Sequence, residues 1–178
     1  MVLQIIKYIL VLGALITSLS AQVWLADTCN ISFFSEAPLE NIEAQSIMPK
    51  GSTYAAFNQA TGKLNFKIPI LSFRFENGLM EEHFNENYME SEKYPYATFK
   101  GKLSHEGDSV VAEGVFQVHG VTKSRKLKGV LVKGEKLILK GSFMVITKEH
   151  KIKIPKLLVK NIAEEIKVDI YCEFIQKI

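Results

Sequence analysis

The sequence predicts an all-β protein, a closed antiparallel up-and-down β-barrel of about eight strands with one amphipathic helix. From residue 28 onward, apolar and polar residues alternate with a period of two, and turn residues interrupt this pattern about every ten positions. Within that part of the chain, only residues 78–95 have the periodicity of a helix. Successive hairpins that share one apolar face would leave unpaired edges in an open sheet, so the pattern favours closure.

The first residues have the pattern of a secretory signal peptide. Lys7 provides a positive charge, residues 8–19 form a short apolar run, and small residues precede a cleavage position near Ala21. An uncleaved membrane anchor is less favoured, because this run is shorter than the ~20 residues that a span needs. We expect a signal peptide at residues 1–21, one domain at residues 22–178, and a periplasmic or secreted protein without a stable membrane span.

The charge of the chain is nearly balanced. The formal net charge is +3 at pH 7, and signal cleavage would remove one lysine from it. A nucleic-acid partner is not expected, because such partners require a basic stripe or patch. The one dense basic run contains Lys123, Arg125, Lys126 and Lys128. It is either a solvated strand face or an anion contact, and in the second case Lys123 and Arg125 are candidates for contacting an anionic head group.

The strand candidates follow one another with turn signals between them. Residues rich in Pro, Gly, Asn and Asp separate most of these alternating segments, as expected for hairpins. The predicted strands fall within residues 28–33, 41–47, 54–57, 63–70, 97–103, 110–118, 126–131, 137–145 and 166–174.

The predicted helix spans about residues 79–91. Asn77 is its expected N-cap, and Pro95 limits how far it can extend. Met80, Phe84 and Tyr88 recur every fourth residue, which makes one face apolar. The opposite face is polar and is expected to point to water: Glu82, Asn85, Glu86 and Ser91.

The two cysteines lie on the first and last predicted strands. Cys29 shares the parity of Ile31, and Cys172 shares the parity of Ile170, so both thiols are expected to point inward. In a closed barrel the first and last strands are neighbours, and an exported protein meets an oxidising compartment. A Cys29–Cys172 disulfide and two buried free thiols are both consistent with this placement.

Four glycines occupy inward positions where a side chain would be expected to fill space. Glycine inside a strand marks either a bend of the wall or a place where another group approaches the backbone closely. If the interior is thinned in this way, the barrel encloses an apolar cavity for one small or extended ligand. The predicted cavity residues are Phe33, Leu64, Phe66, Ile68, Phe84, Tyr88, Phe99, Gly101, Gly114, Phe116, Leu127, Gly129, Leu139, Gly141 and Phe143.

The sequence shows no catalytic or metal-binding motif. The four histidines are scattered without metal-ligand spacing, and no serine-nucleophile or phosphate-loop motif is present. The acidic residues of the helix have the spacing of a solvated face. We therefore expect no enzyme activity, no metal and no cofactor other than a bound lipid.

A longer pattern resembles a known family. It consists of Phe73-x-Phe75, then His83-Phe84-Asn85-x-Asn87-Tyr88-Met89-Glu90-Ser91, then Tyr94-Pro95-x-Ala97-x-Phe99-x-Gly101, and later Val118-His119-Gly120-Val121-Thr122-Lys123. These residues resemble the YceI-like family over essentially the whole mature chain. The resemblance implies an exported, lipocalin-like barrel with a helix beside its opening, which binds a long polyisoprenoid and is not known for catalysis. Where that family often has an Asp-Tyr pair before Ile-x-Ile-Pro, this chain has Glu149-His150.

The leading hypothesis is an exported lipid-binding protein that holds a long-chain, isoprenoid-like amphiphile as a carrier, store or sequestering protein. Its expected partner is a small hydrophobic ligand, and the sequence leaves the oligomeric state open. The alternative is a secreted, non-catalytic interaction or stress-response module whose barrel core is filled.

Overall fold

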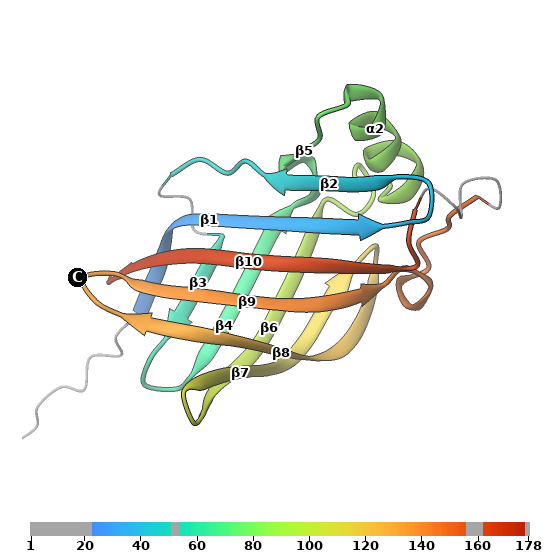
Figure 1. The fold of residues 1–178 in the computed structure, drawn as a ribbon. Coiled ribbons are helices and arrows are strands. Elements are labelled where there is room, and N and C mark those ends of the chain that lie inside the picture. The colour runs from blue at the N-terminus through green and yellow to red at the C-terminus, as the bar shows by residue number, and fades with distance from the viewer. Residues whose placement is uncertain (1–22, 51–53, 156–161, 177–178) are drawn as a thin grey trace, which may run out of the picture.

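The computed structural model describes residues 23–50, 54–155 and 162–176, so the predicted signal peptide lies outside the described residues. Ten strands form one antiparallel sheet within the described part of the chain, together with short helical segments (Figure 1). The helical segments are η1 (Ile70–Ser72), α2 (Gly78–His83), η2 (Phe84–Tyr88) and η3 (Thr147–His150). The strands are β1 (Val23–Glu36), β2 (Asn41–Ser46), β3 (Ala55–Asn58), β4 (Lys63–Pro69), β5 (Phe73–Arg74), β6 (Tyr96–Glu106), β7 (Ser109–Val118), β8 (Val121–Lys133), β9 (Leu137–Ile146) and β10 (Glu165–Gln176).

The sheet closes because its first strand pairs with its last. β1 and β10 pair in antiparallel orientation. This pairing closes a ring of eight strands in the order β1, β3, β4, β6, β7, β8, β9 and β10. The predicted closed barrel is therefore confirmed. β2 is a short additional strand beside the C-terminal half of β1, and the two-residue strand β5 pairs with β2. No helix among the described residues is long and apolar enough to cross a membrane.

Two strands change neighbours along their length and form corners of the barrel. β1 pairs with β3 near its start and with β2 near its end, and its register against β10 shifts between Ala26 and Thr28. β8 pairs with β7 over its first part and with β9 over its last part. In Figure 1, β9 and β10 consequently run across the view, while β4 and β6 run steeply behind them.

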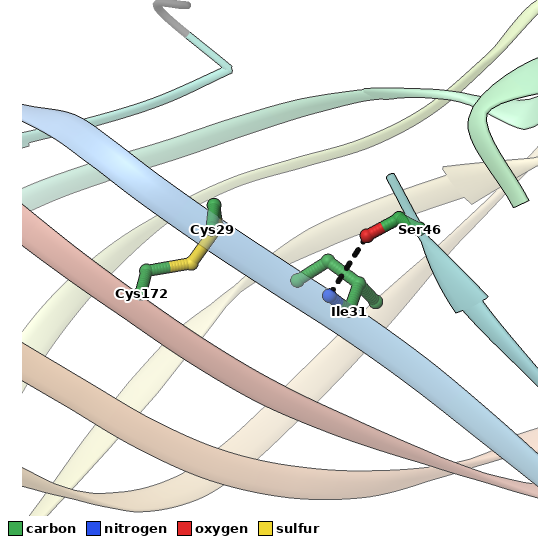
Figure 2. The surroundings of a disulfide bond; sticks show 4 residues. All are labelled: Cys29, Ile31, Ser46 and Cys172. Carbon is green, nitrogen blue, oxygen red and sulfur yellow. Dashed lines mark hydrogen bonds between the residues drawn. A yellow bond between two sulfur atoms is a disulfide. The ribbon is translucent and has the colours of Figure 1, made fainter. Parts of the chain in front are cut away.

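A disulfide joins the two strands that close the barrel. Cys29 of β1 lies opposite Cys172 of β10 in the ladder, and their sulfur atoms are bonded (Figure 2). Next to this bond, the backbone N–H of Ile31 donates to the hydroxyl of Ser46, 2.9 Å away. The staple links positions 143 residues apart in sequence.

One half of the barrel interior is packed solid. The inward side chains at this end come from seven of the eight barrel strands and are almost fully buried. They include Ala26, Phe57, Leu64, Leu103, Val110, Ala112, Leu137, Leu139, Cys172 and Phe174. This half provides the core on which the fold depends, since full burial of each Val, Leu or Phe side chain in it stabilises by about 1.5–3 kcal/mol.

The four inward glycines form a belt at the border of this packed half. Gly101 lies opposite Gly114, and Gly129 lies opposite Gly141, so the belt crosses four successive strands. A side chain at Gly114 or Gly129 would collide with a backbone carbonyl of the neighbouring strand. The glycines therefore allow close approach of strand to strand in a strongly curved wall.

Because of the disulfide, we expect reduction to lower the free energy of unfolding substantially. Alkylation of the unreduced protein should leave both cysteines unmodified in an intact-mass measurement. Replacing both with alanine should lower the free energy of unfolding by roughly 3–5 kcal/mol, because the closed loop is long. Two alkylated thiols before reduction would contradict the bond.

Candidate ligand-binding cavity

The other half of the barrel interior is hollow. A cavity of about 180 Å³ lies beyond the glycine belt, between the barrel wall and the helical segments α2 and η2. Several side chains that point inward here remain partly exposed, because they face this space rather than other side chains. Phe33, Phe143, Val168 and Ile170 are examples.

The structure brings nine of the predicted cavity residues together around this space. They are Phe33, Phe66, Ile68, Phe84, Tyr88, Phe99, Phe116, Leu127 and Phe143. Leu64 and Leu139 instead belong to the packed half, since they are buried and do not line the cavity. The glycines at 101, 114, 129 and 141 do not line the cavity, because their open faces are occupied by the neighbouring strands.

Sequence reasoning missed a further part of the lining. The last strand contributes Ile166, Val168 and Ile170, whose alternation is visible in the sequence and marks them as inward. Ile152, Ile154 and Ile162 lie between η3 and β10, outside the strands and helical segments that the structure describes. No periodicity could have assigned that connection to the cavity; only the resemblance to the family singled out part of it.

The lining offers almost no polar chemistry. The hydroxyl of Ser35 accepts a hydrogen bond from the backbone N–H of Ala163 at 2.9 Å, and that of Thr147 donates to the carbonyl of Glu164 at 3.1 Å. Both hydroxyls are thus engaged by the backbone. Burial raises the pKa of the Tyr88 hydroxyl, which keeps it neutral. The part of the lining that the structure describes is suited to bind hydrocarbon and contains no Asp, Glu or His that could act as acid or base.

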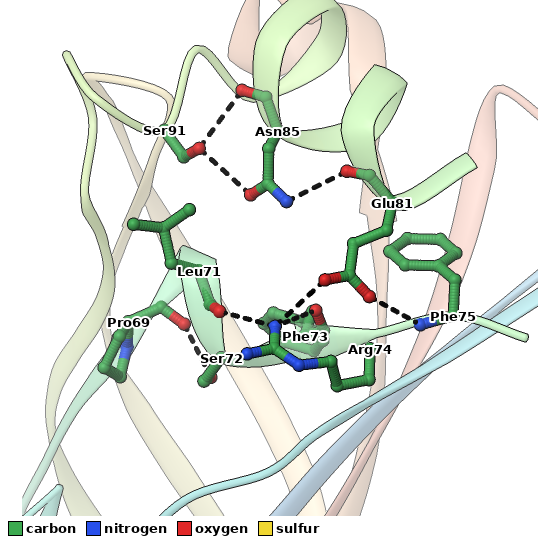
Figure 3. Close-up of polar contacts among 9 residues, drawn as sticks. All are labelled: Pro69, Leu71, Ser72, Phe73, Arg74, Phe75, Glu81, Asn85 and Ser91. Carbon is green, nitrogen blue, oxygen red and sulfur yellow. Dashed lines mark hydrogen bonds and ion pairs between the residues drawn. The ribbon is translucent and has the colours of Figure 1, made fainter. Parts of the chain in front are cut away.

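The predicted helix covers one end of the cavity. It begins after Asn77, whose side-chain oxygen accepts from the N–H of Leu79 at 2.9 Å, so the predicted N-cap is confirmed. Glu81 accepts from the N–H of Phe75 and pairs with Arg74 at 3.2 Å, which fixes the helix to β5 (Figure 3).

Four phenylalanines seal the space beneath the helix. The ring of Phe84 lies 5.3 Å from Phe33, 5.0 Å from Phe75 and 5.9 Å from Phe73, measured between centroids. Such edge and offset contacts add about 0.5–1.5 kcal/mol per pair beyond area burial. Phe84 therefore both lines the cavity and holds the helix to the wall.

The helix ends earlier than predicted, at Tyr88. Its last turn is wider than an α-turn, since the N–H of Met89 donates to the carbonyl of Phe84, and Glu90 then adopts a φ of 45°. Ser91, expected to face water, is instead 3% exposed. Its hydroxyl donates to the Asn85 carbonyl, 3.1 Å away, and lies 3.0 Å from the Asn85 side-chain oxygen (Figure 3). This local cap competes with continuation of the helix.

A partly buried polar network connects the end of the helix to η3. Both ring nitrogens of His119 lie 3.0 Å from acceptors, the carboxylate of Glu90 and the carbonyl of His150. The hydrogen bond with His119 is the main cause that holds the pKa of the Glu90 carboxyl below its usual range. All three non-glycine residues with positive φ in the described chain, Glu90, His119 and Lys151, belong to or adjoin this network. Strained backbone is typical of functional or tightly constrained sites.

The two head-group candidates lie on β8 beside this network. Arg125 shares the inward parity of Leu127, and its side chain is 18% exposed. It pairs with Glu149 and approaches Nε2 of His150 at 3.4 Å. Lys123 is exposed at the rim. The structure places both near the cavity but not in its lining.

These features define a class of protein: a lipocalin-like β-barrel with an apolar chamber in one half and a helix across its end. The chain belongs to the YceI-like family, because the model of the YceI-like domain matches residues 36–174. The resemblance seen in the sequence is therefore confirmed. No curated protein matches the chain.

Solved structures show the same fold. BcnA from Burkholderia cenocepacia superposes with a TM-score of 0.71 at 14% identity, covering 82% of this chain and 95% of BcnA. A polyisoprenoid binding domain from Saccharophagus degradans gives 0.67 at 12% identity, covering 88% and 99%. A YceI protein from Campylobacter jejuni gives 0.57 at 19% identity, covering 76% and 81%. At these identities the likeness shows the fold alone.

The burial of His150 predicts a pH dependence of stability. His150 is fully buried, and desolvation is the main cause that lowers its pKa below 6.5. The folded state therefore binds this proton less well than the unfolded chain does, so the free energy of unfolding should fall as the pH drops below 6.5.

Thermal melts at pH 7 and pH 5 test this expectation. The wild-type melting temperature should fall by roughly a few degrees between them. The decrease should be smaller in His150→Gln and unchanged in His105→Gln, because His105 is exposed on β6. An equal decrease in all three proteins would contradict the assignment.

Proposed function

We propose that the protein is exported and holds a long-chain, isoprenoid-like amphiphile in its barrel, as a carrier, a store or a sequestering protein. The observation that carries the proposal is an apolar cavity in one half of a barrel whose other half is packed solid. Membership of the YceI-like family and the likeness to a polyisoprenoid binding domain support it.

The energetics favour a ligand with a long apolar chain. Each methylene moved from water into such a cavity contributes about 0.8 kcal/mol, so a chain needs few polar contacts to bind well. The cavity of about 180 Å³ is smaller than the ~300–1,000 Å³ of most ligand sites. A long chain therefore has to displace partly exposed aromatic side chains, and we expect these to be Phe33, Phe75 and Phe84 beneath the helix.

The leader and the disulfide support export. Residues 1–21 have the pattern of a signal peptide, and a disulfide between β1 and β10 persists in oxidising compartments such as the periplasm. The proposed role is non-catalytic binding. The alternative, an interaction module with a filled barrel, is less well supported because only half of the barrel is filled.

Filling the cavity tests the function. Val168 of β10 lines the cavity, and Val168→Trp places a large side chain in the space that the lipid chain would occupy. Loss of room for two methylenes alone costs about 1.6 kcal/mol, which corresponds to more than tenfold in affinity. Affinity for geranylgeraniol, measured by displacement of fluorescent N-phenylnaphthylamine, should decrease accordingly.

The same strand provides a matched control. Tyr171 points outward from β10 and is 39% exposed, so Tyr171→Trp adds the same side chain on the outer face. This variant should bind geranylgeraniol like the wild type. If both variants bind equally well at unchanged melting temperatures, the cavity is not the binding site.

A further inference from the structure

Four lysines share the outer face of the neighbouring strands β4 and β6. They are Lys63 and Lys67 of β4 and Lys100 and Lys102 of β6, and all four are exposed. The apolar residues that alternate with them are buried in the barrel, so the lysines point to solvent. Lys63 lies directly opposite Lys102 in the ladder. These four residues form a lysine face on the outer wall of the barrel.

The charge of the lysine face is not neutralised by the protein itself. In the part of the chain that the structure describes, no carboxylate pairs with Lys63, Lys100 or Lys102. Glu113 of β7 lies opposite Lys102, but its carboxylate pairs with Lys126, 3.1 Å away. Like charges that face each other across a ladder are destabilising. The pairing of Lys63 with Lys102 therefore opposes folding slightly, and an external anion would relieve the repulsion.

Exposed apolar side chains continue the lysine face towards η1. The last residue of β4, Pro69, lies opposite Tyr96, the first residue of β6. Nζ of Lys67 lies 4.0 Å from the centroid of the Tyr96 ring, so the charged and aromatic parts of this surface are in contact. η1 follows directly. It places Ile70 in the cavity lining and leaves Leu71 on the outside.

Ile47 lies beside Leu71 and enlarges the apolar part. Its backbone N–H donates to the carbonyl of Ser72 at 2.8 Å. Ile47 is 62% exposed, Leu71 56% and Tyr96 42%. We call these three residues the apolar rim. Single exposed apolar residues are ordinary on a protein surface, but here they adjoin a row of lysines. Lysines beside aromatic and aliphatic side chains are the composition of surfaces that bind at a membrane interface.

We propose that the lysine face and the apolar rim form a docking surface for an anionic phospholipid bilayer, in which the lysines contact the head groups and the rim inserts among them. A bilayer fits better than a soluble acidic partner, because it matches both the charge and the adjoining apolar side chains. The rim also lies on the outside of the wall that Ile70 lines from within. This inference goes beyond the proposed function, because docking does not require a lipid in the cavity.

The helix does not belong to the docking surface. Glu82 of α2 and Glu86 of η2 are exposed, and an anionic bilayer repels them. We therefore expect the barrel to lie on the side formed by β4 and β6, with α2 turned away from the head groups.

Removal of charge from the lysine face tests the inference. Each lysine near an anionic bilayer strengthens binding roughly fivefold. In a sedimentation assay, Lys63→Gln/Lys102→Gln should therefore bind vesicles of phosphatidylcholine and phosphatidylglycerol roughly 30-fold more weakly than the wild type. Its melting temperature should be unchanged or higher, because a repulsive pair is removed. Added salt, or vesicles of phosphatidylcholine alone, should weaken binding of the wild type.

The far wall of the barrel provides a charge-matched control. In the ring of eight strands, β9 is four places from β4, and β10 is four places from β6. In Figure 1, β9 and β10 accordingly run in front of β4 and β6. Lys140 of β9 and Lys167 of β10 are exposed. Lys140→Gln/Lys167→Gln removes the same charge and should bind the vesicles like the wild type.

A second pair of variants tests the apolar rim. Leu71→Gln keeps the charge of the protein and should weaken binding to the anionic vesicles several-fold, because it removes an inserting side chain. Val132 of β8 is also exposed but lies on another part of the wall. Val132→Gln should leave vesicle binding unchanged.

The outcomes separate docking from lipid binding. Lys63 and Lys102 do not line the cavity, so their double variant should bind geranylgeraniol in solution like the wild type. A wild type that docks but binds no geranylgeraniol would contradict the proposed function alone. If the wild type binds no vesicles, or if both lysine double variants bind them equally, the inference fails. Binding of soluble polyglutamate without binding of vesicles would indicate an acidic polymer as the partner and would also overturn it.

Discussion

The antiparallel pairing of β1 with β10 is the interaction on which the rest of the structure depends. It turns a meander of hairpins into a closed barrel and removes the edges that would otherwise be free to pair with other chains. The two strands are far apart in sequence, so bringing them together costs the chain a large loop-closure entropy. The Cys29–Cys172 bond reduces that cost, since it confines the unfolded chain at the same place where the barrel closes.

Closure also explains how the barrel can be hollow without being unstable. The packed half, which includes Leu64 and Phe174, buries enough apolar surface to hold the strands together. The glycine belt allows the wall to curve around this core. The other half then does not need to fill its interior. This hollow half is held together by the phenylalanine cluster beneath the helix and by the network around His119 and His150.

Much of this fold was predictable from the sequence. Alternation with a period of two indicates both where a strand lies and which of its side chains point into the barrel. By this rule Phe66, Phe99 and Phe116 face inward, and in the structure they line the cavity. The same rule could not distinguish Leu64 from Phe66, since inward facing does not tell which half of a barrel is filled.

Other features do not follow from periodicity. Pairing of Gly101 with Gly114 depends on the register of β6 against β7, and burial of Ser91 depends on a local cap. The network that joins Glu90, His119 and His150 links three distant segments and leaves no local pattern.

Organic extraction of the purified, oxidised protein, followed by mass spectrometry of the extract, tests the central claim most directly. We expect one class of long-chain amphiphile in near-equimolar amount, or its uptake when the protein is incubated with isoprenoid lipids. An extract without lipid, together with no uptake of added isoprenoid, would contradict the claim that the hollow half of the barrel is a lipid-binding chamber.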